Sequence, residues 1–299
     1  MRIHADWGAA AWDLPPAARA TGPFPRRGFV ETWWRHRGRG DVLLAEAEGL
    51  LLPLWGDGGV VRIMGEEDLT DYHTPLGRKG LTAFGAALVR ALGPGVRVRL
   101  DSLPEEVAFP LAGGMAAAGV AAAPVQHEAA AVVDLPEDYD DYLAALRGKD
   151  RHEIRRKRRR FVSMLGEPRL EHGPAGFDSF VAMHRAAEGR KGGFMDDAME
   201  AFFGDLLEID GAVLSVLTGD GEPVAAGIGF EDEDGYYLYN SAYAPEHRDA
   251  SPGVVLVDRL VAAAIEAGRP RFDFLKGDEA YKYRTGAVAR PLFALEAAT

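Results

Sequence analysis

The chain has 299 residues and carries 34 Lys and Arg against 46 Asp and Glu, a formal net charge of −12 at pH 7. This length allows two ordinary domains or one large one. The negative charge disfavours general binding to nucleic acid, because such binding depends on cations that attract phosphate. There is no cysteine, which excludes disulfides, thiolate zinc sites and a cysteine nucleophile.

Hydropathy and histidine spacing narrow the class further. The first 20 residues have no basic start followed by an apolar block, and the apolar stretches are shorter than the roughly 20 residues of a membrane helix. We therefore expect a cytoplasmic protein with no secretory signal and no membrane insertion. The eight histidines show no metal-ligand spacing, so we expect no metal site.

The N-terminal half alternates strand-like and helix-like segments. Residues 41–55 read as a β-hairpin with the turn in "EAEG". The segment 81–93 has helical apolar spacing and ends at a glycine, which is typical of a helix C-terminus. Further strands are expected at 60–65, at 96–104 and before Asp134, and a short helix at 109–120. We place a domain boundary near 125–130, which gives an N-terminal domain of residues 1–128 and a C-terminal domain of residues 129–299.

The C-terminal half opens with helices and then changes to strands. The spacing of Leu143, Ile154 and Phe161 predicts an amphipathic helix or helix pair over 134–166, and a second helical region comes next at 177–211. Residues 212–245 predict three strands, because both connectors contain Asp-Gly, a strong hairpin signal. A helix after "RDASPG" and a strand at 271–277 complete the predicted order.

This order resembles the acyl-CoA-binding half of the GNAT acetyltransferase fold. The resemblance implies a splayed strand that meets the pantetheine arm, followed by a helix whose free N–H groups bind the pyrophosphate. The family's loop pattern is Arg/Gln-x-x-Gly-x-Gly/Ala, and "RDASPGVV" matches it loosely. The implied cofactor-binding residues are Arg248, Ser251, Gly253 and Val254, and the co-substrate is acetyl-CoA or a longer acyl-CoA.

Four motifs point to a particular branch of these proteins. They are "LTDYHTPLG", "YLAALRGKDRHEIRRKRRRF", "SAYAPEHRDASPG" and "FDFLKGDEAYKYRTG". Together they resemble motifs of the CelD-like acyltransferases of cellulose biosynthesis and of the Fem peptidoglycan aminoacyltransferases. The resemblance implies an α/β fold with a mixed sheet, built from two GNAT-like domains in tandem, of which the first is degenerate.

The segment "DFLKGDEAYKY" concentrates the groups suited to acyl transfer. The thiolate that leaves needs a proton and the tetrahedral oxyanion needs donors. In GNAT enzymes a tyrosine shortly after the equivalent strand supplies that proton, so the resemblance makes Tyr281 the first candidate acid, with Tyr283 second. Lys276 or Lys282 could stabilise the oxyanion or pair with phosphate, and Asp278 could bind substrate. The alternative is a solvated turn with one tyrosine packed inward.

Other candidates come from separate segments. Asp71 and Tyr72 lie in a loop that the resemblance turns toward the acceptor, although an ordinary turn with a buried tyrosine explains them equally. His184 could act as a base, whereas a lone helical histidine is more often structural. Asn240 and Tyr243 fall on the presumed splayed strand, where they either touch substrate or pack.

Residues 147–161 form a basic run, with nine Lys or Arg and two acidic residues among fifteen. Three interpretations stay open. The run is a solvated helix face, or it binds the phosphates of an aminoacyl-tRNA, or Arg151, His152 and Arg155 hold an anionic part of a donor or acceptor. The run has no interleaved aromatic side chains for stacking bases, and the rest of the chain is acidic.

The sequence therefore predicts an N-acyltransferase that moves an acyl group from acyl-CoA, or from an acyl carrier protein, to an amine of an amino sugar, amino acid or peptide. Because there is no cysteine, we expect direct attack within a ternary complex. The alternatives are aminoacyl transfer from tRNA, and a degenerate scaffold that binds a partner in polysaccharide export.

Overall fold

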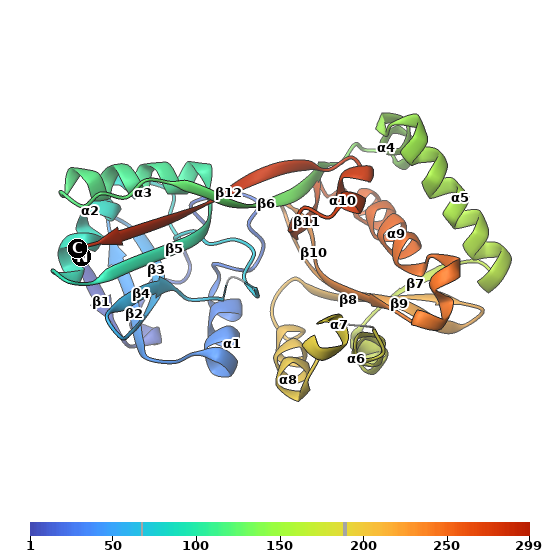
Figure 1. The fold of residues 1–299 in the computed structure, drawn as a ribbon, viewed down its shortest axis with the longest axis horizontal. Coiled ribbons are helices and arrows are strands. Elements are labelled where there is room, and N and C mark those ends of the chain that lie inside the picture. The colour runs from blue at the N-terminus through green and yellow to red at the C-terminus, as the bar shows by residue number, and fades with distance from the viewer. Residues whose placement is uncertain (67, 188–189) are drawn as a thin grey trace. The chain divides into compact units, whose positions relative to one another are not determined.

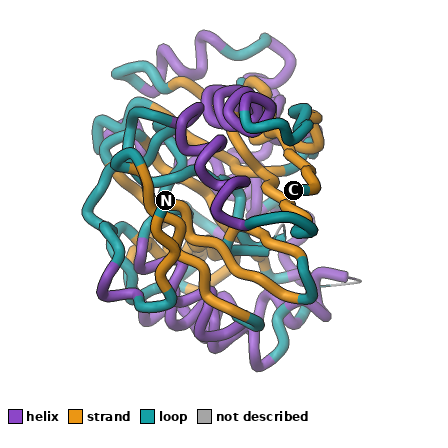
Figure 2. Tube along the Cα trace, turned by 90° about the vertical axis from the view of Figure 1, so that its left-hand side faces the viewer, coloured by secondary structure: helices purple, strands orange, loops and turns teal. Residues whose placement is uncertain are grey.

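The computed structural model describes residues 1–66, 68–187 and 190–299. The chain forms two compact units, each of which is described by itself (Figure 1). Unit 1 comprises Met1–Ala130 and Arg290–Thr299, and unit 2 comprises Ala131–Ala289. Both chain ends therefore belong to unit 1, and both are marked in Figure 2.

Unit 1 is built on a mixed sheet with the strand order β1-β2-β3-β4-β5-β12. Strands β1 to β4 pair with one another in antiparallel fashion, and β5 pairs with β4 in parallel. The turn between β2 and β3 holds Glu48 and Gly49 at positive φ, as a tight hairpin requires. The bounds are β1 Arg2–His4, β2 Asp41–Ala47, β3 Leu50–Asp57, β4 Val60–Ile63, β5 Arg97–Pro104 and β12 Val288–Ala298.

Among its described residues, unit 1 has three α-helices: α1 (Arg27–Arg37), α2 (Leu81–Leu92) and α3 (Glu105–Ala117). Helix α2 connects the parallel strands β4 and β5, and its apolar face, with Phe84 and Leu88, is fully buried. The same core includes side chains of α3 and Leu295 of β12. The last strand of the chain thus completes the first unit.

Unit 2 has a sheet of the same kind, in the order β6-β11-β10-β9-β8-β7. Strands β7 to β10 pair with one another in antiparallel fashion, and β11 pairs with β10 in parallel. The turn between β8 and β9 places Asp220 and Gly221 at positive φ. The bounds are β6 Val125–Asp134, β7 Arg169–His172, β8 Ala212–Gly219, β9 Glu222–Asp232, β10 Gly235–Tyr243 and β11 Arg271–Lys276.

Helix α9 (Pro252–Glu266) connects β10 to β11 and is the most buried helix of this core, with nine buried residues. Helix α5 (Gly148–Leu165) packs against α9, and in Figure 1 it runs along the outer edge of the unit. The other helices are α4 (Tyr139–Ala145), α6 (Phe177–Arg185), α7 (Arg190–Phe194), α8 (Asp197–Leu206) and α10 (Ala280–Arg284).

The two units repeat one topology. In each, a run of antiparallel strands leads through a helix to a strand parallel to the last of them: β1-β2-β3-β4-α2-β5 in unit 1 and β7-β8-β9-β10-α9-β11 in unit 2. The predicted fold class, a mixed α/β sheet made of two similar domains, is confirmed.

The sequence prediction and the structure differ at the chain's end. We expected residues 129–299 to form the second domain, whereas Arg290–Thr299 belong to unit 1, because β12 pairs with β5 from Leu292 opposite Pro104 to Ala298 opposite Arg97. Strand β12 and helix α1 were not predicted. Helix α3 begins four residues earlier than expected and ends three residues earlier, so that Pro110 lies inside it.

Candidate active site

Strands β10 and β11 separate soon after they meet. Their parallel pairing consists of Tyr236 with Phe272 and Tyr237 with Asp273, although β10 continues to Tyr243 and β11 to Lys276. Beyond this point β10 still pairs with β9, with a register shift between Leu238 and Asn240. The separation leaves one edge of β10 available at the carboxyl end of the sheet, where ligands bind in open α/β sheets.

Helix α9 begins beside this opening. Ser251 holds a left-handed backbone (φ 57°) before Pro252, so the chain turns sharply into the helix. Gly253 comes next, and a Cβ there would lie 3.4 Å from Cδ1 of Tyr243. The tyrosine ring of β10 therefore lies against the first turn of α9. The first turn of a helix presents N–H groups and the positive end of the helix dipole, which favour an anion.

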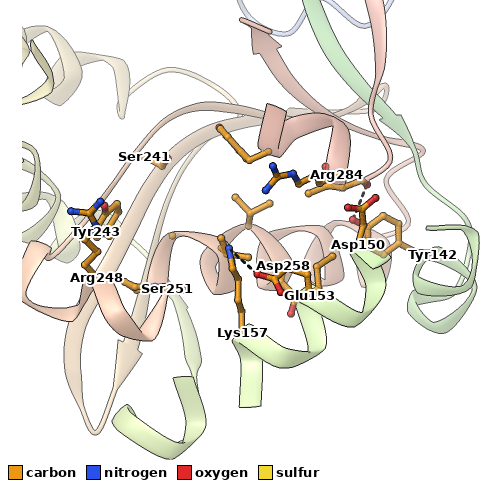
Figure 3. A pocket seen from close by; sticks show the side chains of 17 residues that line it. Tyr142, Asp150, Glu153, Lys157, Ser241, Tyr243, Arg248, Ser251, Asp258 and Arg284 are labelled. Atoms are coloured by element: carbon orange, nitrogen blue, oxygen red, sulfur yellow. Dashed lines mark hydrogen bonds and ion pairs between the residues drawn. The ribbon is translucent and has the colours of Figure 1, made fainter. Parts of the chain in front are cut away.

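A cavity of about 410 Å³ lies at this place, and all of its lining residues belong to unit 2. Its walls come from α5, from the end of β10, from the first turns of α9 and from α10. Figure 3 shows Tyr243, Arg248 and Ser251 together at one end, Asp150, Tyr142 and Arg284 at the other, and Lys157, Glu153 and Asp258 between them. The lining residues are Tyr142, Asp150, Glu153, Ile154, Lys157, Ser241, Tyr243, Arg248, Ser251, Pro252, Gly253, Val254, Val257, Asp258, Tyr281, Arg284 and Thr285.

Helix α5 turns one face toward the cavity. Asp150, Glu153, Ile154 and Lys157 line it, with the spacing of three and four residues that places side chains on one face of a helix. Phe161 continues this face and is fully buried in the core of unit 2. The long basic helix is therefore two-sided, with a cavity-lining face and a solvent-facing one.

Helix α10 brings Tyr281 to the cavity. The tyrosine ring makes an edge contact with Phe274, and the residue is 42% exposed. Partial burial, with a smaller contribution from Glu279, raises the pKa of the Tyr281 phenol to about 12. The phenol therefore keeps its proton at neutral pH and can donate it.

A buried lysine shapes the turn between β11 and α10. Lys282 is 4% exposed, and its Nζ donates to the carbonyl oxygen of Lys276 at 2.5 Å and pairs with Glu279 at 3.0 Å. Leu275 has a left-handed backbone (φ 60°), and its amide donates to Oδ1 of Asp273. The ammonium group thus holds carbonyl groups at the end of β11, where the chain leaves the sheet.

The charged groups of the cavity differ in their surroundings. Glu153 accepts two hydrogen bonds of 2.8 Å from Arg156, which lower its pKa to about 2, and Lys157 is 3.8 Å away. Asp258 is 6% exposed and accepts a hydrogen bond from the Tyr139 hydroxyl. Burial raises the pKa of Asp258 above the ordinary carboxyl range.

The cavity brings together part of the set that the sequence suggested. Tyr281, Tyr243 and the four residues that the resemblance suggested for cofactor binding, Arg248, Ser251, Gly253 and Val254, all line it. Asn240 precedes Ser241 on β10, and since side chains alternate along a strand, Ser241 and Tyr243 share the face that lines the cavity. Of the described residues in the suggested set, those outside the lining are Asp71, Tyr72, Arg151, His152, Arg155, His184, Asn240, Lys276, Asp278, Lys282 and Tyr283.

Several of these residues have other surroundings. His184 is 1% exposed and packs edge-on against Phe180. Tyr72 is fully buried in unit 1, beneath the guanidinium of Arg290, and Asp71 precedes it there. Arg151 donates to the carbonyl oxygens of Leu143 and Ala144 near the end of α4, whereas Arg155 is exposed on α5.

Sequence reasoning missed the inner face of α5 and the pair of Tyr139 and Asp258. A signal for the first was present, because Ile154 and Phe161 are the apolar residues of the basic run and define its buried side. No such signal marks Asp258, which comes after the valines of α9 in a stretch that otherwise reads as apolar.

Residues 148–283 match the family model for the acetyltransferase (GNAT) domain. The matched range includes α5, the hairpins of unit 2, α9, β11 and Tyr281, and so most of the cavity described above. This part of the chain therefore matches a GNAT domain, as the sequence motifs suggested. Among curated proteins, no relative of the chain was found.

Solved structures resemble the whole chain in fold. A conserved protein of unknown function from Bacteroides thetaiotaomicron has a TM-score of 0.65 at 13% identity, over 95% of this chain and 93% of that one. FemX has a TM-score of 0.64 at 12% identity, over 94% and 93%. L-PGS from Bacillus licheniformis has a TM-score of 0.59 at 16% identity, over 93% of each chain. At these identities the likeness establishes the shared fold.

Two further findings concern the described residues only. No helix among them combines the length and hydrophobicity needed to cross a bilayer. Among the same residues, no group of three or more His, Asp or Glu side chains is arranged to hold a metal ion.

Proposed function

We propose that the protein is an N-acyltransferase that transfers an acyl group from a phosphopantetheine thioester to an amine. The observation that carries this proposal is the cavity where β10 leaves β11, closed at one end by the first turn of α9. Most of its lining lies within the residues that match the GNAT domain. An extended arm fits along the unpaired edge of β10, and its phosphate fits at the start of α9.

Arg248, Ser251 and Gly253 supply the hydrogen-bond donors for the phosphate at the end of the cavity next to α9. A guanidinium, a hydroxyl and a backbone N–H at a helix start are the donors that proteins use to bind phosphate. Val254 and Val257 provide an apolar wall further along the cavity. This arrangement suits either acyl-CoA or the prosthetic arm of an acyl carrier protein, because both present the same thioester on the same arm.

The neutral form of the acceptor amine attacks the thioester carbonyl directly, the carbon–sulfur bond then breaks, and the nitrogen loses a proton that restores the Tyr281 phenol. Tyr281 supplies the proton that the leaving thiolate takes up, since its phenol stays protonated at neutral pH. The chain has no cysteine, so no acyl-cysteine intermediate forms.

Aminoacyl transfer from tRNA is the second candidate. The exposed basic side chains of α5 favour it, since they could bind RNA phosphate. The two candidates differ in the donor, so they are separated by the donor that supports turnover.

The test is a thiol-release assay with the purified protein. Acetyl-CoA and decanoyl-CoA are offered as donors, with a panel of amino sugars, amino acids and short peptides as acceptors, and products are identified by mass spectrometry. The proposal predicts amine-dependent thiol release with formation of an amide. Amide formation from aminoacyl-tRNA, with none from either thioester, would replace it with the second candidate.

A further inference from the structure

The outer face of α5 is a basic surface next to the donor cavity. We call it the basic stripe and define it by Lys149, Arg155, Arg156, Arg159 and Arg160, which are all exposed. Helix α5 has 18 residues and is about 27 Å long at 1.5 Å per residue. Arg155 and Arg159 lie on the side of α5 away from the cavity-lining residues, whereas Arg156 and Arg160 lie nearer to the cavity, since Arg156 pairs with Glu153 and Arg160 approaches Asp249.

Much of this charge is not neutralised within the protein. Arg156 pairs with Glu153, and Arg160 lies 3.7 Å from Asp249. Neither Arg155 nor Arg159 forms an ion pair with any residue that the structure describes. On a chain of net charge −12, such a surface is a local exception, and it attracts an anionic partner.

The stripe is continuous with the phosphate end of the cavity. Asp249, which Arg160 approaches, comes directly after Arg248 in the loop that leads to α9. One end of the stripe, at Arg160, therefore lies near the loop that carries Arg248 to the cavity. A molecule bound along α5 can pass an arm over Arg248 into the cavity.

The start of α9 has few donors for phosphate. Pro252 has no N–H, and the amides of Val254 and Val255 donate to the carbonyl oxygen of Ser251. Among the first-turn amides, that of Gly253 donates to no residue that the structure describes. One amide with Ser251 and Arg248 suits a single phosphodiester better than the diphosphate of coenzyme A, which needs several donors.

From these observations we infer that the donor is delivered by an acidic acyl carrier protein, which docks on the basic stripe and inserts its acylated phosphopantetheine arm into the cavity. This inference rests on the proposed function and names the donor's carrier. A carrier arm has one phosphate, matching the start of α9, and an acidic helix of the carrier matches α5 in charge. A tRNA fits less well, because its phosphates would need cations on further elements and the rest of the chain is acidic.

The test measures binding, so it does not depend on knowing the acceptor. A bacterial fatty-acid acyl carrier protein in its decanoyl form is titrated into the purified protein at low and moderate salt, and decanoyl-CoA and bulk tRNA are titrated in parallel. The stripe variant is Arg155→Glu with Arg159→Glu. The matched control is Arg90→Glu with Arg97→Glu, which makes the same change of charge at exposed positions of unit 1.

We expect the carrier protein to bind the wild type in a salt-sensitive manner and the stripe variant to bind it about tenfold more weakly or worse. The control variant should bind the carrier as the wild type does, and decanoyl-CoA should bind all three proteins equally. Absence of carrier binding, or equal binding by the stripe variant, would overturn the inference. Stripe-dependent binding of tRNA without binding of the carrier would overturn it in favour of RNA.

The outcomes also separate this inference from the proposed function. If decanoyl-CoA supports amide formation while the carrier protein does not bind, the acyltransferase stands and the carrier is rejected. If the carrier binds through the stripe and no donor supports amide formation, the docking surface stands and the proposed reaction is rejected.

Discussion

Units 1 and 2 share one topology and differ at the point where the parallel strands meet. In unit 1, β4 pairs with β5 at Val60, Val61 and Arg62, which is nearly the whole of that short strand. In unit 2, the longer β10 pairs with β11 at two residues and then diverges. Continued pairing closes the sheet in one unit, and its early end opens a cavity in the other.

The connections that follow β4 in unit 1 and β10 in unit 2 also differ, in length and in burial. Between β4 and α2 the chain is long, and Thr70, Tyr72 and Leu76 within it are fully buried. Between β10 and α9 the connection is short, and Arg248 and Asp249 within it are exposed. The comparison shows that one topology serves as a packed scaffold or as a binding site, depending on where the strands separate and on whether the next connection is buried or exposed.

The largest expected effect is on the stability of unit 1. Phe84→Ala removes a fully buried ring from the core of unit 1, and such truncations cost about 3–5 kcal/mol. Chemical denaturation should show this loss, whereas the exposed neighbour change Thr82→Ala should have little effect. Decanoyl-CoA should bind the folded Phe84→Ala protein as it binds the wild type. Loss of that binding in folded protein would show that the division of roles between the units is wrong.

The next effect concerns chemistry in unit 2. Tyr281→Phe removes the proposed proton donor and keeps the ring against Phe274, so kcat should fall about 100-fold with donor affinity unchanged. Tyr283→Phe is the control, because that residue packs against the core of unit 2 and does not line the cavity. Steady-state kinetics with the acceptor found in the screen measure both variants. Equal kcat for Tyr281→Phe and the wild type would remove Tyr281 from the role.

A smaller effect is expected where β11 ends. Lys282→Met keeps the length of the side chain and leaves the carbonyl of Lys276 without its buried donor. Leaving a buried acceptor unsatisfied costs about 1–3 kcal/mol. Thermal denaturation should show this loss, while the exposed change Arg284→Met should show less. Unchanged stability of Lys282→Met would mean that packing alone, without the hydrogen bond from Lys282, stabilises the end of β11.

The smallest effect is a pH dependence. The pKa of Asp258 is raised in the folded protein because burial disfavours its charge, so the folded protein loses stability as pH rises from the ordinary carboxyl pKa through the folded value. Asp258→Asn keeps an acceptor for Tyr139 and does not titrate. The variant's advantage over the wild type in melting temperature should therefore grow from pH 4 toward pH 8. Tyr142, Arg158 and Arg259 also act on this carboxyl, and they are the same in both proteins. If the difference in melting temperature between Asp258→Asn and the wild type stayed constant over this pH range, the pKa of Asp258 would not be raised by burial in the folded protein.

Much of unit 2 could be predicted because its signals are local. The Asp-Gly turns, the spacing of apolar residues and the Pro-Gly start of α9 each act within a few residues, and the structure has all of them. The loop residues Arg248, Ser251 and Gly253 were predicted from that local pattern together with the family resemblance, and they line the cavity.

The features that could not be predicted depend on residues far apart in the chain. The pairing of β12 with β5 joins segments almost 200 residues apart, for example Leu292 with Pro104. The sequence does not show that Lys282 turns inward to carbonyl groups, because an exposed lysine would have the same neighbours. Asp258 is another such case, since its partner Tyr139 lies on α4.

The central claim is that the opening between β10 and β11 is the donor site, and a binding titration tests it most directly. Decanoyl-CoA is titrated calorimetrically into the wild type and into Ser241→Trp, which fills the cavity from β10, with the exposed change Ser163→Trp as control. The account predicts saturable binding by the wild type and the control, and loss of binding by Ser241→Trp at an unchanged melting temperature. Equal binding by all three proteins would place the donor elsewhere and contradict the account.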